Sequence, residues 1–202
     1  MISRRDRGPR WLLCLHGLQS DHTLFQPLLA DPAFGSFSVL APDIMDFGHD
    51  LLSQADGVAA LLEKEAIPAV TIVGHSLGGM IGILLLRQIP QKIVSLVSLE
   101  GNLAEPDCGE SLRISRLTRD AYPGKSAVFH TAKSIVQWST SGELATIFRS
   151  SPHPKLLLLG EKSPFHSRPI APNLKTQIIP NAGHFLFQDN PADTLKAIRD
   201  FL

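Results

Sequence analysis

Short runs of consecutive apolar residues alternate along the chain with stretches of helical periodicity. Apolar runs without polar alternation are typical of strands that are covered on both faces of a sheet. Six such runs occur, at residues 11–15, 37–41, 69–73, 93–99, 155–159 and 176–179. Because these runs alternate with helical patterns, the sequence predicts parallel strand pairing in an α/β fold, a three-layer sandwich with a mostly parallel sheet of about six strands.

Two helical patterns are especially clear. Residues 50–66 place Leu51, Ala55, Val58 and Leu62 at the spacing of one buried helical face. The last segment of the chain opens with Asn190 as a potential N-cap and Pro191 at the first helical position.

The region between Gly101 and Pro154 contains no apolar strand pattern. Residues 111–122 and 131–148 are predicted to be amphipathic helices that flank a Pro-Gly pair at 123–124. An insertion at the carboxyl end of a strand lies over the edge of a parallel sheet where ligands bind. We therefore expect a single domain over residues 1–202, with residues 101–153 forming a helical cap or lid.

Composition and charge narrow the class of partner. The chain has 202 residues, 44% of them hydrophobic, and its 19 Lys and Arg balance its 19 Asp and Glu. This length and hydrophobicity suit one globular domain with a sizeable core. A neutral balance gives no electrostatic reason to expect nucleic acid or an anionic membrane, so a small-molecule partner is expected. The oligomeric state is not predicted.

Cysteine usage and the amino-terminal segment bear on location. Cys14 and Cys108 form neither a disulfide framework nor a metal cluster, which indicates a reducing compartment. The basic start followed by residues 11–15 has the appearance of a secretory signal, but the apolar run is short and is interrupted by His16. No stretch approaches the ~20 apolar residues of a membrane span. A cytoplasmic protein without a membrane span is therefore expected.

The strongest chemical motif is Gly-His-Ser-Leu-Gly at residues 74–78, between a predicted strand and a predicted helix. In that context G-x-S-x-G forms a nucleophile elbow. The turn is so sharp that Ser76 should have a strained backbone, and Gly74 and Gly78 should be small because strand and helix nearly touch. Ser76 is thus the candidate nucleophile.

At this point the chain resembles the α/β-hydrolase fold family, in particular its serine esterase and lipase-like members, over nearly its full length. Residues 12–21 (LLCLHGLQSD) resemble the oxyanion strand and loop, and residues 39–50 (VLAPDIMDFGHD) the strand and turn before the first long helix. Residues 178–202, with N-A-G-H and a terminal helix, resemble the closing histidine loop. The family's usual opening hairpin is expected to be absent, since the chain starts almost directly at the oxyanion strand.

His184 is the candidate general base, because it follows a predicted strand in a loop where Gly183 permits a close approach. Among the other histidines, His75 should point away from Ser76, and His16 is expected to be structural. The resemblance implies that the backbone amides of Leu18 and Leu77 form the oxyanion hole, while their side chains form apolar walls.

The carboxylate that would orient His184 has several candidates. The family most often places it in a G-x-x-D loop after the next-to-last strand, but here Ser163 occupies the position of the aspartate. Some members place the acid one strand earlier, where Glu100 ends the apolar run 93–99. Parallel strands end on one edge of the sheet, so Glu100 could reach the same imidazole. Glu161, Asp107 or an incomplete triad remain alternatives.

These elements predict a serine hydrolase that cleaves a carboxylic ester or related acyl compound through an acyl-enzyme, with the triad Ser76, His184 and Glu100. No cofactor or metal is expected. A thioesterase, an amidase or a C–C bond hydrolase would use the same site. A catalytically silent ligand-binding module on the same fold is the alternative from another class.

Overall fold

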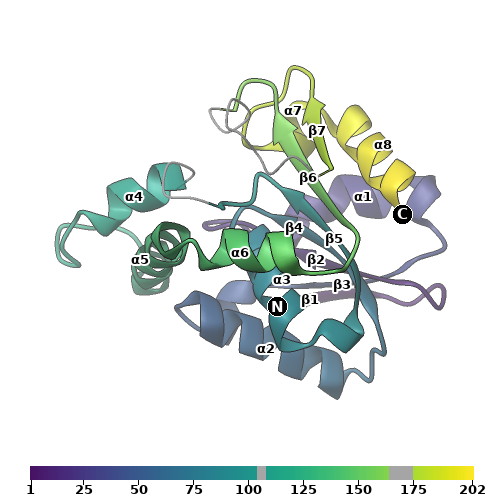
Figure 1. The fold of residues 1–202 in the computed structure, drawn as a ribbon, viewed down its shortest axis with the longest axis horizontal. Helices are drawn as coiled ribbons and strands as arrows, with labels where there is room; N and C mark the ends of the chain where they lie inside the picture. The colour runs from purple at the N-terminus through teal and green to yellow at the C-terminus, as the bar shows by residue number, and fades with distance from the viewer. Residues whose placement is uncertain (104–107, 164–174) are drawn as a thin grey trace.

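The structure is a computed structural model, and it describes residues 1–103, 108–163 and 175–202. Seven strands in these ranges form one sheet in the order β1-β3-β2-β4-β5-β6-β7 (Figure 1). The strands are β1 (Ile2–Arg5), β2 (Trp11–Leu15), β3 (Ser38–Pro42), β4 (Val70–His75), β5 (Ile93–Leu99), β6 (Lys155–Gly160) and β7 (Thr176–Ile179). All six predicted strands are present and pair in parallel, which confirms the predicted sheet.

The first strand corrects the predicted count. β1 pairs antiparallel with β3 at the edge of the sheet, so the sheet has seven strands rather than six, and the chain does have an opening antiparallel strand. Its sequence, Ile-Ser-Arg-Arg, is short, and its residues alternate between exposed and half-buried. An edge strand of this kind carries no apolar run, which is why the hydrophobic pattern missed it.

Helices cover both faces of the sheet (Figure 1). One face packs against α2 (Leu51–Lys64) and α3 (Leu77–Gln88), and the other against α1 (Gln26–Ala30), α7 (Leu186–Asp189) and α8 (Pro191–Phe201). Within β2, Leu13 and Leu15 face the first group, whereas Leu12 and Cys14 face the second. Both faces are therefore buried, as the continuous apolar runs predict. Short 3-10 helices complete the connections, at His22–Phe25, Pro32–Phe34, Ile44–Phe47 and Pro90–Lys92.

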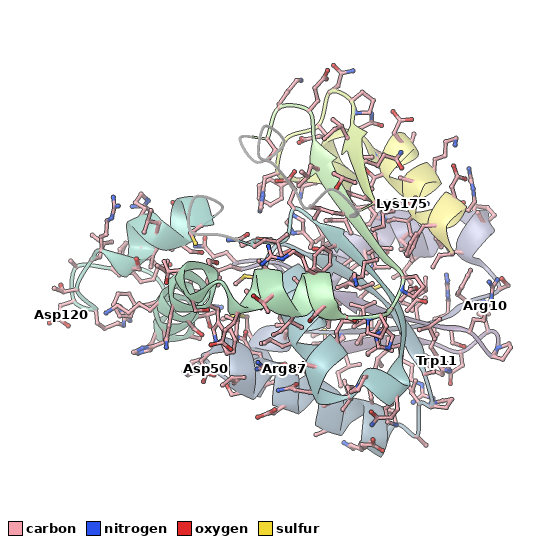
Figure 2. The ribbon with its side chains drawn as sticks, viewed as in Figure 1. Arg10, Trp11, Asp50, Arg87, Asp120 and Lys175 are labelled. Atoms are coloured by element: carbon pink, nitrogen blue, oxygen red, sulfur yellow. The ribbon has the colours of Figure 1, made fainter. Side chains whose placement is uncertain are left out.

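The helix starts follow from local capping. Asp50, labelled at the start of α2 in Figure 2, accepts hydrogen bonds from the backbone amides of Leu52 and Ser53, both at 3.0 Å. Asn190 caps α8 through the backbone amide of Asp193 at 3.2 Å, as predicted. Each cap satisfies amides that the first helical turn leaves unpaired.

The segment that follows β5 is helical, but its boundaries differ from the prediction. It contains α4 (Gly109–Ser115), α5 (Ser126–Ser141) and α6 (Glu143–Ser150). The predicted helix over 111–122 stops at Ser115, and the run 131–148 is divided at Gly142, whose φ of 74° ends α5. α6 packs against α3, while α4 and α5 project beyond the sheet (Figure 1). No helix within residues 1–103, 108–163 and 175–202 has the length and hydrophobicity needed to cross a bilayer.

Candidate functional site

The turn between β4 and α3 has the strained geometry expected of a nucleophile elbow. Ser76 has φ 52° and ψ −114°, a conformation that costs a non-glycine residue about 1–3 kcal/mol. The backbone amide of Ser76 donates to the carbonyl of Leu99 at 2.8 Å, so the neighbouring strand holds the turn. The prediction of a strained backbone at Ser76 is confirmed.

The two motif glycines lie where no side chain would fit. A Cβ atom on Gly74 would lie 2.5 Å from the carbonyl oxygen of Gly78, and one on Gly78 would lie 2.0 Å from the carbonyl oxygen of Leu15. The backbone of the elbow therefore packs directly against the end of β2. This confirms that close backbone approach explains both glycines.

Glu100 lies at the carboxyl end of β5, fully buried, with a φ of 53°. Its Oε1 accepts a hydrogen bond from the backbone amide of Gly160 at 2.6 Å, and its Oε2 accepts one from Ser163 Oγ at 2.7 Å. The same Oε2 lies 3.4 Å from Nδ1 of His184, whose side chain is 35% exposed. The buried carboxylate is thus fixed on two sides while it faces the imidazole.

Of the two other acid candidates, Glu161 and Asp107, the structure describes Glu161. Glu161 is exposed, and its Oε2 accepts a hydrogen bond from the backbone amide of Asn181 at 2.8 Å. Ser163 is 1% exposed and holds Glu100, so the position that carries aspartate in many family members supports a glutamate from the next strand. Asp107 lies outside the described residues.

A cleft of about 650 Å³ brings together three of the candidate residues, Leu18, Ser76 and His184. It is bordered by both Ser76 and His184, together with the loop after β2 and the start of α4. The remaining described lining residues are Gly17, Leu18, Gln19, Ser20, His75, Asn102, Cys108, Gly109, Glu110, Ser111, Phe185 and Gln188. Residues from five separate segments therefore meet at the carboxyl edge of the sheet, as expected for this topology.

The two predicted oxyanion residues differ in their surroundings. Leu77 is the first residue of α3, so its backbone amide has no acceptor within the helix. The side chain of Leu77 is fully buried in the core, which corrects the expectation that it lines the site. Leu18 does border the cleft, and its side chain also packs against Ile114 and its neighbours near α4.

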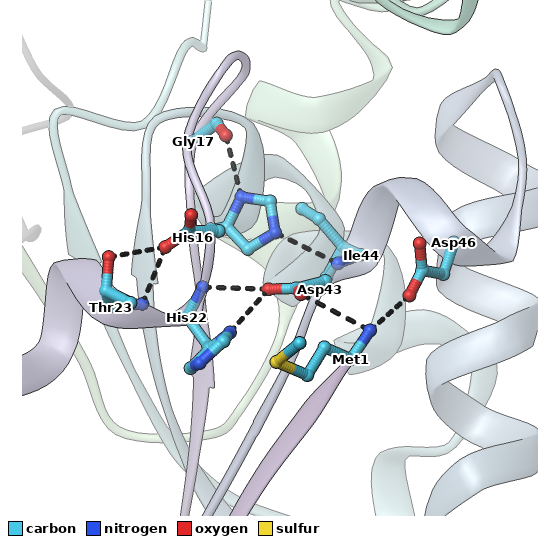
Figure 3. Close-up of polar contacts among 9 residues, drawn as sticks. Met1, His16, Gly17, His22, Thr23, Asp43, Ile44 and Asp46 are labelled. Atoms are coloured by element: carbon cyan, nitrogen blue, oxygen red, sulfur yellow. Dashed lines mark hydrogen bonds and ion pairs between the residues drawn. The ribbon is translucent and has the colours of Figure 1, made fainter.

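His16 and Asp43 hold the loop after β2 in place (Figure 3). His16 is buried; its Nδ1 donates to the carbonyl of Gly17 at 2.8 Å and its Nε2 accepts from the backbone amide of Ile44 at 3.0 Å. His16 is therefore structural, as predicted. Asp43 accepts from the backbone amide of His22 at 2.9 Å and from its ring at 2.8 Å. Partial burial opposes ionisation, but these bonds and the Met1 amino group outweigh it and lower the pKa of Asp43 to about 2.

His75 links the elbow to the loop that carries His184. Its Nε2 donates to the backbone carbonyl of His184 at 2.8 Å, and the two imidazole centroids are 4.9 Å apart. Burial lowers the pKa of His75 to about 3, and the neighbouring His184 acts in the same direction. A neutral imidazole with this tautomer positions the His184 loop but is no general base near neutral pH.

This buried histidine makes stability depend on pH. The ordinary pKa of histidine is about 6.5, so between that value and about 3 the unfolded chain binds a proton that folded His75 does not. The free energy of unfolding should therefore fall as the pH drops below about 6.5, by roughly 1 kcal/mol per pH unit. Urea unfolding at several pH values measures this slope. His75→Gln should flatten it, whereas His130→Gln, at an exposed site, should not; equal slopes in wild type and His75→Gln would contradict the prediction.

Several site residues were not predicted from the sequence. They are Asn102, Phe185 and Gln188 in the cleft wall, and the hydroxyl of Ser163 behind Glu100. Asn102 follows Glu100 by two residues at the same strand end. That proximity to a candidate acid was the available signal for Asn102, whereas Gln188 carries no signal of this kind.

A family model described as the alpha/beta hydrolase family matches residues 12–197. The chain belongs to this family. The match covers all the segments that form the cleft, from the loop after β2 to the histidine loop before α7.

Among curated relatives, an uncharacterized protein of Mycobacterium tuberculosis is 31% identical over 118 residues, which are 54% of this chain and 34% of the relative. The chain thus spans about a third of the length of such relatives. The 2-(acetamidomethylene)succinate hydrolase of Mesorhizobium japonicum is 23% identical over 100% of this chain and 90% of its own.

Solved structures of other proteins share the fold. An N-acyl homoserine lactonase aligns with a TM-score of 0.77 and 20% identity, covering 99% of this chain and 90% of its own. A thermophilic esterase from Thermogutta terrifontis aligns with a TM-score of 0.74 and 18% identity, covering 99% and 92%. At these identities the likeness concerns the fold.

Proposed function

We propose that this protein is a serine hydrolase that cleaves a carboxylic ester or a related acyl compound through an acyl-enzyme. The observation that carries the proposal is the cleft that strained Ser76 and His184 both border, with the buried Glu100 carboxylate 3.4 Å from Nδ1 of His184. The presence of an esterase and a lactonase among the structural neighbours supports ester chemistry. Residues 101–153 would act as a cap, since the start of α4 borders the cleft.

The chemistry follows from the placement of each group. Glu100, fixed by Gly160 and Ser163, would hold the Nδ1 proton of His184. In that tautomer Nε2 is the basic nitrogen, and it would accept the proton of Ser76 as the hydroxyl attacks the acyl carbon. The protonated His184 then delivers that proton to the leaving alcohol. Water, activated in the same way, hydrolyses the acyl-enzyme and regenerates Ser76.

The tetrahedral intermediate in each half-reaction carries a negative charge on oxygen. We assign its stabilisation to the backbone amides of Leu77 and Leu18. The amide of Leu77 stands at the amino terminus of α3, where the helix dipole also favours negative charge. Because both donors are main-chain groups, substitution of either leucine side chain should affect packing more than the oxyanion.

Location is part of the proposal. The sequence contains two cysteines, Cys14 and Cys108, too few for a disulfide framework, and such sparse cysteine usage is typical of proteins from reducing compartments. We therefore place the enzyme in the cytoplasm.

The proposal is tested by covalent labelling of folded protein with a fluorophosphonate probe, followed by peptide mass spectrometry. We expect one adduct, on Ser76, because only an activated serine attacks such a probe at neutral pH. The matched control is Ser76→Ala, which should take up no label. Absence of an adduct on Ser76 in the folded wild type would instead support a silent binding module.

A further inference from the structure

One buried polar group in the cleft wall has no role in the proposed reaction. Asn102 is 4% exposed and borders the cleft beside Ser76 and His184, and its Oδ1 has no hydrogen-bond partner among residues 1–103, 108–163 and 175–202. Most buried polar side chains in folded proteins are hydrogen-bonded. A buried carboxamide oxygen without a partner costs about 1–3 kcal/mol, and a leucine of similar size would pack there without that cost.

The backbone fixes Asn102 close to the reacting serine. Leu99 accepts the amide hydrogen of Ser76 at 2.8 Å, and a Cβ atom on Gly79 would lie 3.2 Å from Cα of Gly101. The chain from Leu99 to Asn102 therefore lies against the elbow. A substrate bonded to Ser76 through its acyl carbon would extend past this wall.

We infer that Asn102 is a specificity-determining residue that recognises an amide group in the acyl portion of the substrate. A carboxamide offers one acceptor and two donor hydrogens, which complement the N–H and C=O of a secondary amide. An alkyl chain would leave the buried Oδ1 unpaired, whereas an amide N–H would satisfy it. Sites that hydrogen-bond a substrate group reject analogues that lack it more strongly than apolar pockets reject an extra group. The inference rests on the proposed hydrolase function.

Three p-nitrophenyl esters of equal chain length separate the contributions of the amide N–H and the amide C=O to recognition. They are the pentanoate, the 4-oxopentanoate and the N-acetylglycinate. The acyl chain of the pentanoate has neither an N–H nor a second C=O, that of the 4-oxopentanoate has only the second C=O, and that of the N-acetylglycinate has both groups in one amide. The readout is the ratio of kcat/KM for N-acetylglycinate to that for pentanoate in each protein. Comparing this ratio between variant and wild type cancels the intrinsic reactivity of the esters.

Asn102→Leu should lower this ratio by about tenfold or more, the value of one hydrogen bond. The Tm of Asn102→Leu should be unchanged or higher, because an unpaired buried polar group is removed. Gln137→Leu, which replaces an exposed carboxamide on α5, should keep the wild-type ratio.

Two results would overturn the inference. One is a ratio that Asn102→Leu leaves unchanged; the other is a Tm lowered by several degrees, which would identify Asn102 as a structural group. Failure of the proposed hydrolase function would give a different result. The wild type would then hydrolyse none of the three esters faster than Ser76→Ala does, and the inference about Asn102 would be wrong as well.

Discussion

Replacement of Gly78 by alanine is expected to destabilise the protein by about 3 kcal/mol or more, the upper range for overpacking a core. The added Cβ would lie 2.0 Å from the carbonyl oxygen and 2.4 Å from the carbonyl carbon of Leu15, and 2.8 Å from the carbonyl oxygen of His16. All three are backbone atoms, so no side-chain rotation relieves the clash. Either α3 moves away from the sheet or β2 shifts.

Gly142→Ala provides the matched control. Gly142 has a φ of 74°, and within the part of the chain that the structure describes no atom lies within 4 Å of an added Cβ, so this change introduces conformational strain without a clash. It should cost only about 1 kcal/mol. Urea denaturation of both variants measures the difference. A Gly78→Ala variant no less stable than Gly142→Ala would show that the elbow can move away from β2.

The hydrophobic pattern predicted the sheet and its pairing because buried parallel strands are continuously apolar. The pattern missed β1, which forms one edge of the sheet and whose sequence, Ile-Ser-Arg-Arg, contains no apolar run. It also joined α5 to α6, because residues 131–148 keep a helical period across Gly142 although the backbone there is left-handed. Local patterns report burial more reliably than they report chain reversals.

The candidate site was predictable to the extent that it lies in local motifs. Ser76 and His184 are candidates because they stand in recognisable turns, and Glu100 is a candidate because it ends a strand while Ser163 occupies the usual position of the acid. The supporting bonds could not be predicted, since they join residues far apart in sequence. The bonds from His75 to His184 and from Ser163 to Glu100 depend on how strand ends meet across the sheet.

Glu100→Gln is expected to lower kcat by roughly 10³–10⁴-fold, the scale found when the acid of a serine triad becomes an amide. Glutamine keeps the shape of the side chain and can still accept the amide hydrogen of Gly160. Its amide group would, however, face Nδ1 of His184 as a donor, which favours the tautomer with the proton on Nε2. That imidazole cannot accept the proton of Ser76.

The variant should remain folded, because glutamine fills the same buried volume beside Ser163. Circular dichroism and urea denaturation verify this. Glu161→Gln is the matched control, since Glu161 is an exposed carboxylate in the loop where the family usually carries its acid. The same chemical change is thus made at two carboxylates, of which only Glu100 lies beside His184.

The assignment of Glu100 as the acid that orients His184 is tested most directly by measuring kcat of the two variants side by side on one p-nitrophenyl ester. We predict that Glu100→Gln loses roughly 10³-fold or more, while Glu161→Gln stays within about twofold of wild type, as expected for a solvent-exposed charge. The reverse result, an inactive Glu161→Gln and a nearly unaffected Glu100→Gln, would contradict the assignment and place the acid in the loop after β6.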